Sequence, residues 1–284
     1  PGWRACPYGV RPYGGSGRKG GSVAGTLEPV AVLGLGAMGS RMAHRALRAG
    51  IPTIVWNRHR EATRDLAAAG AEVADTAADA ALRAGIVVTM VSDAEAVGSI
   101  AREQGLLAAL RPDAIWAQMS SIGVAATDKL IDLVRTQRRD VTFIDAPVVG
   151  SREPAERGEL LILASGPQAA RPRLNPLFNA LGHTIWTVPA GTGTRLKVVN
   201  NTWLAFASEA VVASLAVARR LGLPTEAVTD LFADNPLVSP WQRAKLQRLT
   251  RGEYEPQFPL SLALKDVRLA QQVTDDDQFV ALAG

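Results

Sequence analysis

The fold is decided by one stretch near the start of the chain, which reads Val30-Ala31-Val32-Leu33-Gly34-Leu35-Gly36-Ala37-Met38-Gly39. Its four leading apolar residues predict a buried strand, and three glycines with the spacing GxGxxG follow that strand directly. Residues typical of helices then continue as far as Gly50. Strand, glycine turn and helix in this order predict a loop whose backbone can hold a dinucleotide.

Each glycine of this loop has its own expected task. Gly34 permits the tight turn, Gly36 lets a pyrophosphate approach the backbone, and Gly39 lets the helix pack closely on the strand. Free N–H groups at the start of the helix then face the phosphates, so Leu35, Ala37 and Met38 are expected cofactor contacts as well. A glycine-rich turn without any ligand is the alternative interpretation.

Residues 29–190 alternate short apolar runs with segments rich in Ala, Leu and Arg. Continuous apolar runs predict strands that are buried on both faces of a parallel sheet. We expect strands over Val30–Gly34, Thr53–Trp56, Ile86–Val91, Ala114–Met119, Thr142–Ile144, Leu160–Ala164 and Thr184–Thr187, with helices such as Met42–Ala49 and Glu61–Ala69 between them. This alternation predicts a Rossmann-type, doubly wound α/β domain.

Residues 191–284 have a different character, because helical runs replace the alternation. Leu196–Leu221 contains no helix breaker and is apolar on nearly every side, which predicts a helix that is buried on most sides. Further helices are expected over Thr225–Ala233, Trp241–Leu249 and Leu262–Val273. The predicted fold class is therefore α/β, with a Rossmann-type sheet domain followed by an all-α C-terminal domain.

The first 28 residues are rich in glycine and lack apolar periodicity, which predicts a disordered tail. The tail holds Arg4, Arg11, Arg18 and Lys19, which account for the whole net charge of +4, so residues 28–284 are neutral. The sequence therefore predicts no basic groove for nucleic acid. An RNA-contacting arm, suggested by the aromatic residues of the tail, is a minor alternative.

Composition excludes several other classes of protein. With 47% hydrophobic and 20% charged residues, the 284-residue chain can bury a core, which a disordered protein cannot. No run of 18 apolar residues occurs, so we expect no membrane-spanning helix. One cysteine, Cys6, and three histidines are too few for a zinc framework, so no metal is expected. The cysteine usage fits a reducing, cytoplasmic compartment.

The end of the second predicted strand indicates the type of cofactor. It reads Val55-Trp56-Asn57-Arg58, and no acidic residue occurs before Glu61. An acid at this place would hold the 2′-hydroxyl of NAD, whereas a guanidinium can bind the 2′-phosphate of NADP. We therefore expect NADPH to be preferred over NADH, with Asn57 and Arg58 at the phosphate. The alternative is that Arg58 is an ordinary solvated residue at a helix start.

Lys197 and Asn201 are the candidate catalytic residues. They lie four positions apart near the start of the long predicted helix and so share one of its faces. Burying a lysine among the apolar residues of that helix costs free energy unless the lysine is paired or used. A partly desolvated lysine is a usable general acid or base. A lysine that extends to solvent from the helix start is the alternative.

Together these motifs resemble the β-hydroxyacid dehydrogenases, which include 3-hydroxyisobutyrate dehydrogenase and 6-phosphogluconate dehydrogenase. The resemblance runs from about Val30 to Gln272, over the blocks Gly34–Gly39, Met90-Val91-Ser92-Asp93, Met119-Ser120-Ser121-Ile122, Asp145-Ala146-Pro147-Val148, Gly191–Asn201 and Lys265-Asp266. The glyoxylate/succinic semialdehyde reductase subgroup, whose members prefer NADPH, is most similar over Gly150–Ala164, Val55–Arg58 and Lys265–Ala270.

This resemblance implies roles for individual residues. Lys197 matches the lysine that donates a proton to the carbonyl oxygen, and Asn201 matches the asparagine that orients it. Ser121 matches a residue near the nicotinamide and the substrate carboxylate, while Lys265 lies near the cofactor and Asp266 shapes the pocket. Val91 and Ser92 belong to the expected cofactor contacts. Without the resemblance, Lys265 and Asp266 would be read as a solvated pair.

The sequence departs from the family pattern at three places. Val149 stands where a serine hydroxyl usually helps to bind the substrate carboxylate, which leaves the backbone of Gly150 and Ser151 for that task. A bulkier or less polar substrate is the favoured consequence, with Trp241 and Phe258 either lining an apolar pocket or lying in the core. Gln118 replaces a frequent aspartate, and the C-terminal lobe is expected to be short.

The favoured function is an NADPH-dependent oxidoreductase that transfers hydride to a small aldehyde or keto acid, such as glyoxylate, succinic semialdehyde or a 3-hydroxyisobutyrate-like acid. Lys197 is its expected general acid, and the expected assembly is a homodimer or homotetramer. The alternative is a cofactor-binding scaffold with weak or lost catalysis. An imine reductase ranks lower, because those related enzymes usually carry an acid or a tyrosine where Lys197 stands.

Overall fold

The computed structural model describes residues 27–255 and 259–274. The chain divides into two compact units, residues 1–197 and 198–284, and each is described by itself below. The tail predicted over residues 1–28 lies outside the described part except for its last two residues, and so do Cys6 and Phe258.

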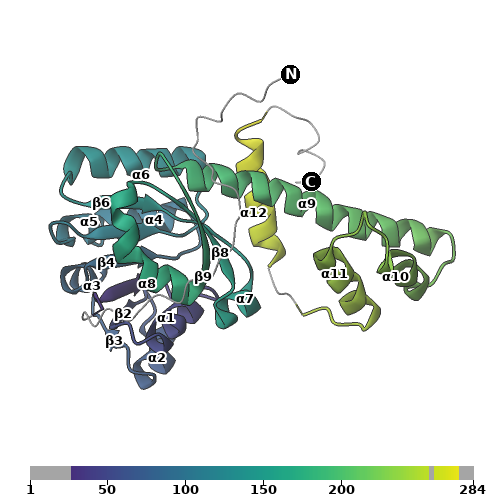
Figure 1. The fold of residues 1–284 in the computed structure, drawn as a ribbon, viewed down its shortest axis with the longest axis horizontal. Helices are drawn as coiled ribbons and strands as arrows, with labels where there is room; N and C mark the ends of the chain where they lie inside the picture. Colours follow the sequence, from purple (N-terminus) through teal and green to yellow (C-terminus); the bar gives the residue numbers. More distant parts are fainter. Residues whose placement is uncertain (1–26, 256–258, 275–284) are drawn as a thin grey trace. The chain divides into compact units, whose positions relative to one another are not determined.

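The first unit is built on one twisted sheet (Figure 1). Within the described residues its strand order is β3-β2-β1-β4-β5-β6-β8-β7, with β9 paired to β8. The strands are β1 Val30–Leu33, β2 Thr53–Trp56, β3 Glu72–Val73, β4 Ile86–Thr89, β5 Ile115–Gln118, β6 Thr142–Asp145, β7 Val148–Val149, β8 Leu160–Ser165 and β9 Gly182–Thr187. The strands β3-β2-β1-β4-β5-β6 pair with one another in parallel, so the predicted parallel sheet is confirmed for this part.

Helices cover both faces of this sheet because successive residues of each strand point to opposite sides. Val30 and Val32 of β1 join a core with α1 and α8, whereas Ala31 and Leu33 join a second core with α3 to α6. The helices are α1 Gly39–Arg48, η1 Arg60–Thr63, α2 Arg64–Ala68, α3 Ala77–Arg83, α4 Ala94–Arg102, α5 Leu106–Ala109, α6 Val124–Gln137, α7 Arg152–Arg157, η2 Gln168–Ala170 and α8 Arg171–Leu181. Burial on both faces explains the continuous apolar runs.

The strand order reverses direction between β1 and β4. From β1 the chain moves outward to β2 and β3, and it then returns to place β4 on the other side of β1. In open α/β sheets, ligands bind beyond the carboxyl ends of the strands at such a switch point. The loops after β1, β4 and β5 therefore frame the candidate site.

At one end of the sheet, the strands predicted over Leu160–Ala164 and Thr184–Thr187 are present as β8 and β9, but the pairing there was not predicted. Strand β8 runs antiparallel to β6 and to β7, and β9 then pairs in parallel with β8 over six residues. Strands β3 and β7 have two residues each, which is too short for any periodicity to indicate them.

The second unit is helical, as predicted. It contains most of α9 Thr192–Arg220, followed by α10 Thr225–Ala233, α11 Pro240–Thr250 and α12 Leu260–Gln271. Val211 and Ala218 of α9 pack with Val228 of α10 and Leu246 of α11. Val267 and Ala270 of α12 pack against another part of α9.

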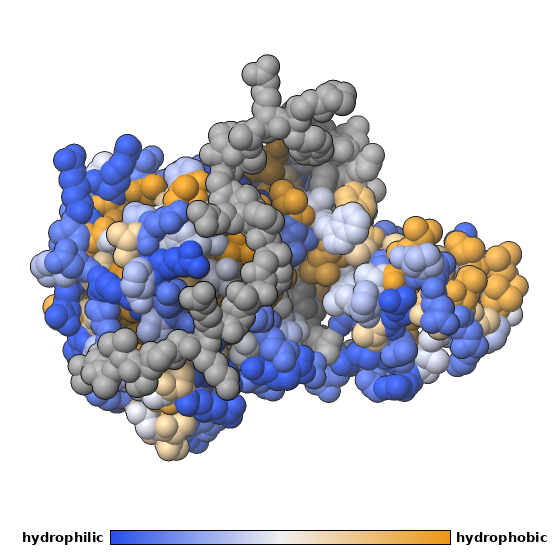
Figure 2. Space-filling model, in the orientation of Figure 1, coloured by the Kyte–Doolittle hydropathy of each residue, from blue (hydrophilic) through white to orange (hydrophobic). Residues whose placement is uncertain are grey.

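The prediction that α9 is buried on most sides is wrong for the single chain. Only 17% of its most apolar window is buried, and Trp203 is 78% exposed. The reason is that α10, α11 and α12 cover only part of the α9 surface, and apolar side chains remain on the outside of the unit (Figure 2). By length and composition alone, α9 is also long and apolar enough to cross a membrane, a property that core helices of soluble proteins share. Trp241, at 39% exposed, is likewise not a core residue, and its ring lies 5.4 Å from the Lys245 ammonium.

Candidate active site

The glycine turn between β1 and α1 leaves no room for larger residues at two of its positions. Gly34 has a φ of +96°, and a Cβ there would collide with the Met90 carbonyl oxygen and with Val91 Cγ1. A Cβ at Gly39 would collide with the Gly34 carbonyl oxygen. The turn therefore packs directly on the β4 loop on one side and on the first residue of α1 on the other.

Gly36, in contrast, faces open space, since a Cβ added there would have no neighbour within 4 Å. Gly36 and Ala37 are exposed, and Met38 is half-buried. Among the described residues, the backbone N–H groups of these three positions donate no hydrogen bond. Unused N–H groups at the start of a helix suit an anion, so this turn fits the pyrophosphate of a dinucleotide.

The Asn57 side chain makes two hydrogen bonds within the protein. Its side-chain Oδ1 accepts a hydrogen bond from the Leu35 N–H at 2.9 Å, and its Nδ2 donates to the His59 carbonyl oxygen at 3.0 Å. The Leu35 N–H is therefore used inside the protein and does not face a phosphate. Asn57 instead fixes the glycine turn to the end of β2.

Arg58 follows directly and is exposed. Within residues 27–255 and 259–274 it has no ion-pair partner, whereas the nearby Arg60 pairs with Asp75 at 2.7 Å. Arg58 thus lies at the end of β2 with an uncommitted guanidinium, beside a turn that carries no carboxylate before Glu61.

The loops after β4 and β5 are joined by side-chain hydrogen bonds. Ser120 Oγ accepts a hydrogen bond from the Val91 N–H at 2.8 Å. The side-chain amide of the fully buried Gln118 bonds both the N–H and the carbonyl oxygen of Ser120. The exposed Ser92 hydroxyl donates to Asp93 at 2.5 Å, and Ser121 is half-buried. These loops bring Val91, Ser92 and Ser121 to the carboxyl edge of neighbouring strands, as their sequence positions suggested.

The segment after β6 carries the candidate substrate residues. Val149 is half-buried and pairs with Leu161 of β8, so it offers a methyl surface and no hydroxyl. Gly150 has a φ of +136°, and a Cβ there would lie 2.7 Å from Leu160 Cδ2. Ser151 precedes α7 and forms no side-chain cap for it. The backbone path from Val149 to Ser151 is therefore fixed by glycine geometry.

A buried carboxylate anchors the start of α9. Asp145, at the end of β6, is 0% exposed and accepts the Thr194 N–H and hydroxyl, each at 2.7 Å, as well as the Ser165 hydroxyl at 3.1 Å. Ser165 Oγ also accepts the N–H groups of Gly191 and Gly193. Burial raises the pKa of Asp145, while these hydrogen bonds and the charge of Arg195 oppose that rise.

Lys197 lies one helical turn beyond this anchor and is half-buried. It is four residues from Gly193, whose Cβ would collide with the Leu163 carbonyl oxygen, so both positions share the helix face that packs toward the sheet. The Lys197 side chain is accordingly partly buried on this face. Sequence reasoning missed the anchor residues Asp145, Ser165 and Thr194, although Asp145 begins one of the blocks that carry the family resemblance.

In the second unit, Asn201 and Asp266 form a buried pair. Asn201 Nδ2 donates to Asp266 Oδ2 at 2.6 Å, and the two residues are 7% and 8% exposed. Asn200 Nδ2 also donates to Asn201 Oδ1 at 3.1 Å, and Lys265 Nζ lies 4.0 Å from Asp266 Oδ1. The Asn201 amide is therefore held in one orientation, and Asp266 is not a solvated residue.

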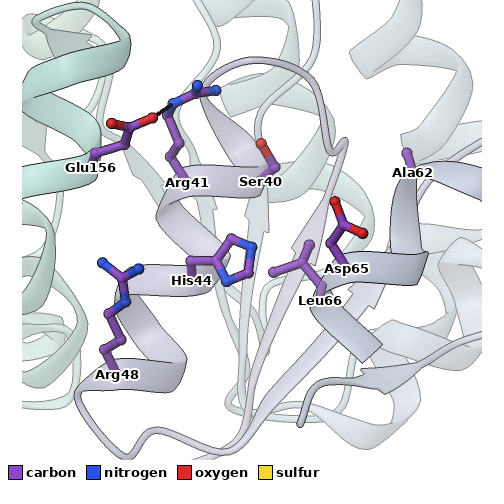
Figure 3. A pocket seen from close by; sticks show the side chains of 8 residues that line it. All are labelled: Ser40, Arg41, His44, Arg48, Ala62, Asp65, Leu66 and Glu156. Atoms are coloured by element: carbon purple, nitrogen blue, oxygen red, sulfur yellow. Dashed lines mark hydrogen bonds and ion pairs between the residues drawn. The ribbon is translucent and has the colours of Figure 1, made fainter. Parts of the chain in front are cut away.

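A separate pocket of about 370 Å³ lies between α1, α2 and α7 (Figure 3). Arg41 pairs there with Glu156 at 2.7 Å, and His44, Arg48 and Asp65 also line the wall. The pocket contains as many carboxylates as guanidinium groups, so it favours no particular ligand charge. None of the predicted site residues lines it. In the described part of the chain, no group of three His, Cys, Asp or Glu side chains could hold a metal ion.

Comparisons with known proteins agree with this geometry. The family model for the NAD binding domain of 6-phosphogluconate dehydrogenase matches residues 29–191, more than half of the chain. The chain belongs to the β-hydroxyacid dehydrogenase family. A second model of this family, the NAD-binding domain of NADP-dependent 3-hydroxyisobutyrate dehydrogenase, matches residues 191–282.

Individual family members are similar over most of their length. The chain is 33% identical to an uncharacterized oxidoreductase of Bacillus subtilis, covering 85% of each protein. It is 28% identical to glyoxylate/succinic semialdehyde reductase 1 of Arabidopsis thaliana, over 87% of this chain and 86% of that protein. The structure of Mycobacterium tuberculosis 3-hydroxyisobutyrate dehydrogenase with L-serine has 25% identity and a TM-score of 0.80, over 90% and 91% of the two chains. The protein is therefore an NAD(P)-dependent oxidoreductase.

Proposed function

We propose that this protein is an NADPH-dependent reductase of a small aldehyde or keto acid, with Lys197 as the general acid. The observation that carries the proposal is the placement of Lys197. It is half-buried, lies one turn after a helix start that Asp145 and Ser165 lock onto the sheet, and shares a helix face with Asn201.

In the proposed reaction a bound nicotinamide cofactor would supply the hydride that the carbonyl carbon accepts. The Lys197 ammonium donates its proton to the carbonyl oxygen, where negative charge develops as the bond order falls. Asn201, held by Asp266, orients the lysine and the substrate oxygen. The hydrogen bond from Asn201 Nδ2 to Asp266 fixes the orientation of the amide before any substrate binds.

The preference for NADPH rests on the end of β2. Arg58 is exposed and has no ion-pair partner among the described residues, and the turn there has no carboxylate to repel a phosphate. A guanidinium can bind a phosphate through two parallel charged hydrogen bonds. The Asn57 amide is used within the protein, so we assign the 2′-phosphate contact to Arg58 and a supporting role to Asn57.

The proposed substrate class follows from the segment after β6. A backbone that glycine geometry holds in place can bind a carboxylate, while Val149 presents methyl groups beside it. This combination favours an acid with a less polar or bulkier chain over the smallest members, glyoxylate among them. Succinic semialdehyde and the semialdehydes whose reduction gives 3-hydroxyisobutyrate-like acids remain in the proposed class.

The test is NADPH consumption with a panel of short aldehyde and keto acids, comparing the wild type with Lys197→Ala. We expect turnover to fall by about 10²–10⁴ in the variant, the usual contribution of a positioned acid, while NADPH binding measured by fluorescence is retained. Lys245→Ala, which removes another half-buried lysine, is the matched control and should leave turnover unchanged.

Two results would count against this function. Turnover that survives in Lys197→Ala would remove the proposed mechanism. A wild-type protein that binds NADPH and reduces none of the acids would favour the scaffold alternative.

We also propose that a second copy of the chain covers the apolar surface of the helical unit. The exposed residues Val199, Trp203 and Val212 lie on α9, and Leu231 and Leu237 lie in and after α10. Apolar surface of this extent is typical of an interface. A dimeric or tetrameric mass in light scattering supports the proposal, and Trp203→Glu should shift the mass toward the monomer. A monomeric wild type at micromolar concentration would contradict it.

A further inference from the structure

Gln118 is a fully buried glutamine whose side chain turns back on its own chain. It is the last residue of β5, with an exposed fraction of 0%. Its Oε1 accepts the Ser120 N–H at 2.7 Å, and its Nε2 donates to the Ser120 carbonyl oxygen at 2.9 Å. One amide group thus satisfies both backbone groups of the same residue and fixes the loop after β5.

Ser120 carries this constraint to the neighbouring loop. Its Oγ accepts the Val91 N–H at 2.8 Å and donates to the Thr89 carbonyl oxygen at 3.3 Å. Val91 in turn packs on the glycine turn, since a Cβ at Gly34 would lie 2.5 Å from Val91 Cγ1. A continuous series of contacts therefore runs from Gln118 through Ser120 and Val91 to the phosphate-binding turn.

These contacts lie at the switch point of the sheet. Strands β1, β4 and β5 are direct neighbours, and the loops after them meet at the carboxyl edge where a dinucleotide binds. Ser121, the residue after Ser120, is half-buried at the same edge. The end of β2, with Arg58, is fixed separately through the hydrogen bond between Leu35 and Asn57.

We propose that Gln118 is a positioning residue for the nicotinamide half of the cofactor. It acts through Ser120, by holding the loops after β4 and β5 as one unit, and it does not touch the cofactor itself. Glutamine suits this task because its amide both accepts and donates. An ionised carboxylate only accepts, so it would face the Ser120 carbonyl oxygen without a proton between them. The inference rests on the proposed function only for the identity of the cofactor as NADPH.

If Gln118 only stabilised the sheet, its substitution would have a different effect on cofactor binding. A general loosening of the sheet would weaken binding of every part of the cofactor. Loss of the Gln118 contacts alone should weaken NADPH more than adenosine 2′,5′-bisphosphate, because that fragment has no nicotinamide. It reaches only the end of β2 and the glycine turn, which the hydrogen bond between Leu35 and Asn57 holds without Gln118.

The experiment compares Gln118→Met and Ser120→Ala with the wild type, using fluorescence and calorimetry to measure the dissociation constants of NADPH and adenosine 2′,5′-bisphosphate. Met keeps the volume of the side chain, and Ser120→Ala removes the bonds of the hydroxyl to Val91 and Thr89. We expect each variant to bind NADPH about tenfold more weakly, the effect of one or two lost hydrogen bonds, and the fragment less than about twofold more weakly. Thr53→Val removes a buried hydroxyl at the opposite edge of the sheet and should change neither constant.

Equal losses for both ligands, or no loss for NADPH, would overturn the inference. If Gln118→Met does not fold, Ser120→Ala decides the question alone, because it breaks the link to the β4 loop through which Gln118 is proposed to act. Binding is measured without substrate, so a protein that lacks turnover would refute the proposed function and leave this inference standing. If NADH binds more tightly than NADPH, the same comparison is made with NADH and adenosine 5′-monophosphate.

Discussion

The carboxylate of Asp145 accepts two hydrogen bonds of 2.7 Å from Thr194, one from its backbone N–H and one from its hydroxyl. These residues are 49 positions apart, at the end of β6 and in the first turn of α9. The hydroxyl of Thr194 also lies 3.2 Å from that of Thr127 in α6. The start of the helix that carries Lys197 is therefore joined to both the sheet and a neighbouring helix.

The first prediction concerns the stability of this anchor. Burial raises the pKa of Asp145, so the folded protein keeps the proton at a pH where the unfolded chain has lost it. The contribution of this carboxyl to the free energy of unfolding therefore falls as pH rises from the ordinary aspartate range through the raised pKa. Asp145→Asn keeps the shape without the charge. Urea unfolding at several pH values should show the variant improving relative to the wild type as pH rises, whereas a pH-independent difference would contradict this prediction.

The second prediction concerns cofactor preference. Arg58→Ala should raise the dissociation constant for NADPH by roughly one to two decades, because a hydrogen-bonded charge pair is lost. The constant for NADH should change little, since NADH has no 2′-phosphate. Arg111→Ala, which removes an exposed arginine just before β5, serves as the control. Equal effects of Arg58→Ala on the two cofactors would refute the assignment.

The third prediction concerns the missing hydroxyl after β6. Val149→Ser should raise kcat/KM for glyoxylate or succinic semialdehyde by about one to two decades, because a hydrogen bond to the carboxylate is restored. Val149→Ala removes the same methyl groups without adding a donor and should not give this gain. If turnover of these acids does not rise with serine, this position does not bind the carboxylate.

The fourth prediction concerns the pair in the helical unit. Asp266→Leu leaves the buried Asn201 amide without its partner, so the free energy of unfolding should fall by about 1–3 kcal/mol. Asn201→Leu combined with Asp266→Leu should recover part of that loss, because neither polar group is then left alone. Chemical unfolding of the four proteins in this cycle measures the coupling. Strictly additive losses would show that the 2.6 Å contact contributes no stability.

The sequence predicted those parts of the fold that local patterns specify. The strand before Gly34, the helix Thr225–Ala233 and the change to an all-helical C-terminal part follow from short-range periodicity and glycine placement. The antiparallel pairing of β8 with β6 and β7 was not predictable, because it depends on contacts between distant strands and on strands of two residues.

In the candidate site, too, local features were predictable and contacts between distant residues were not. The glycine turn and the spacing of Lys197 and Asn201 are local features. In contrast, the partners of Asp145 and Asp266 lie 49 and 65 residues away, and no periodicity relates them. Asn57 was expected at the phosphate because of its position, but its side chain serves the Leu35 N–H, 22 residues away. The exposure of α9 was missed because an apolar surface indicates burial without indicating which chain provides the cover.

The contact at Gly193 has a consequence for how the reacting group is aimed. A Cβ at this position would collide with the Leu163 carbonyl oxygen and lie 3.0 Å from that of Asp145. The start of α9 can therefore lie this close to the sheet only because Gly193, four residues before Lys197, has no Cβ. A methyl group added there would push the start of the helix away from the sheet. The Lys197 ammonium would then be displaced, although the lysine itself is unchanged.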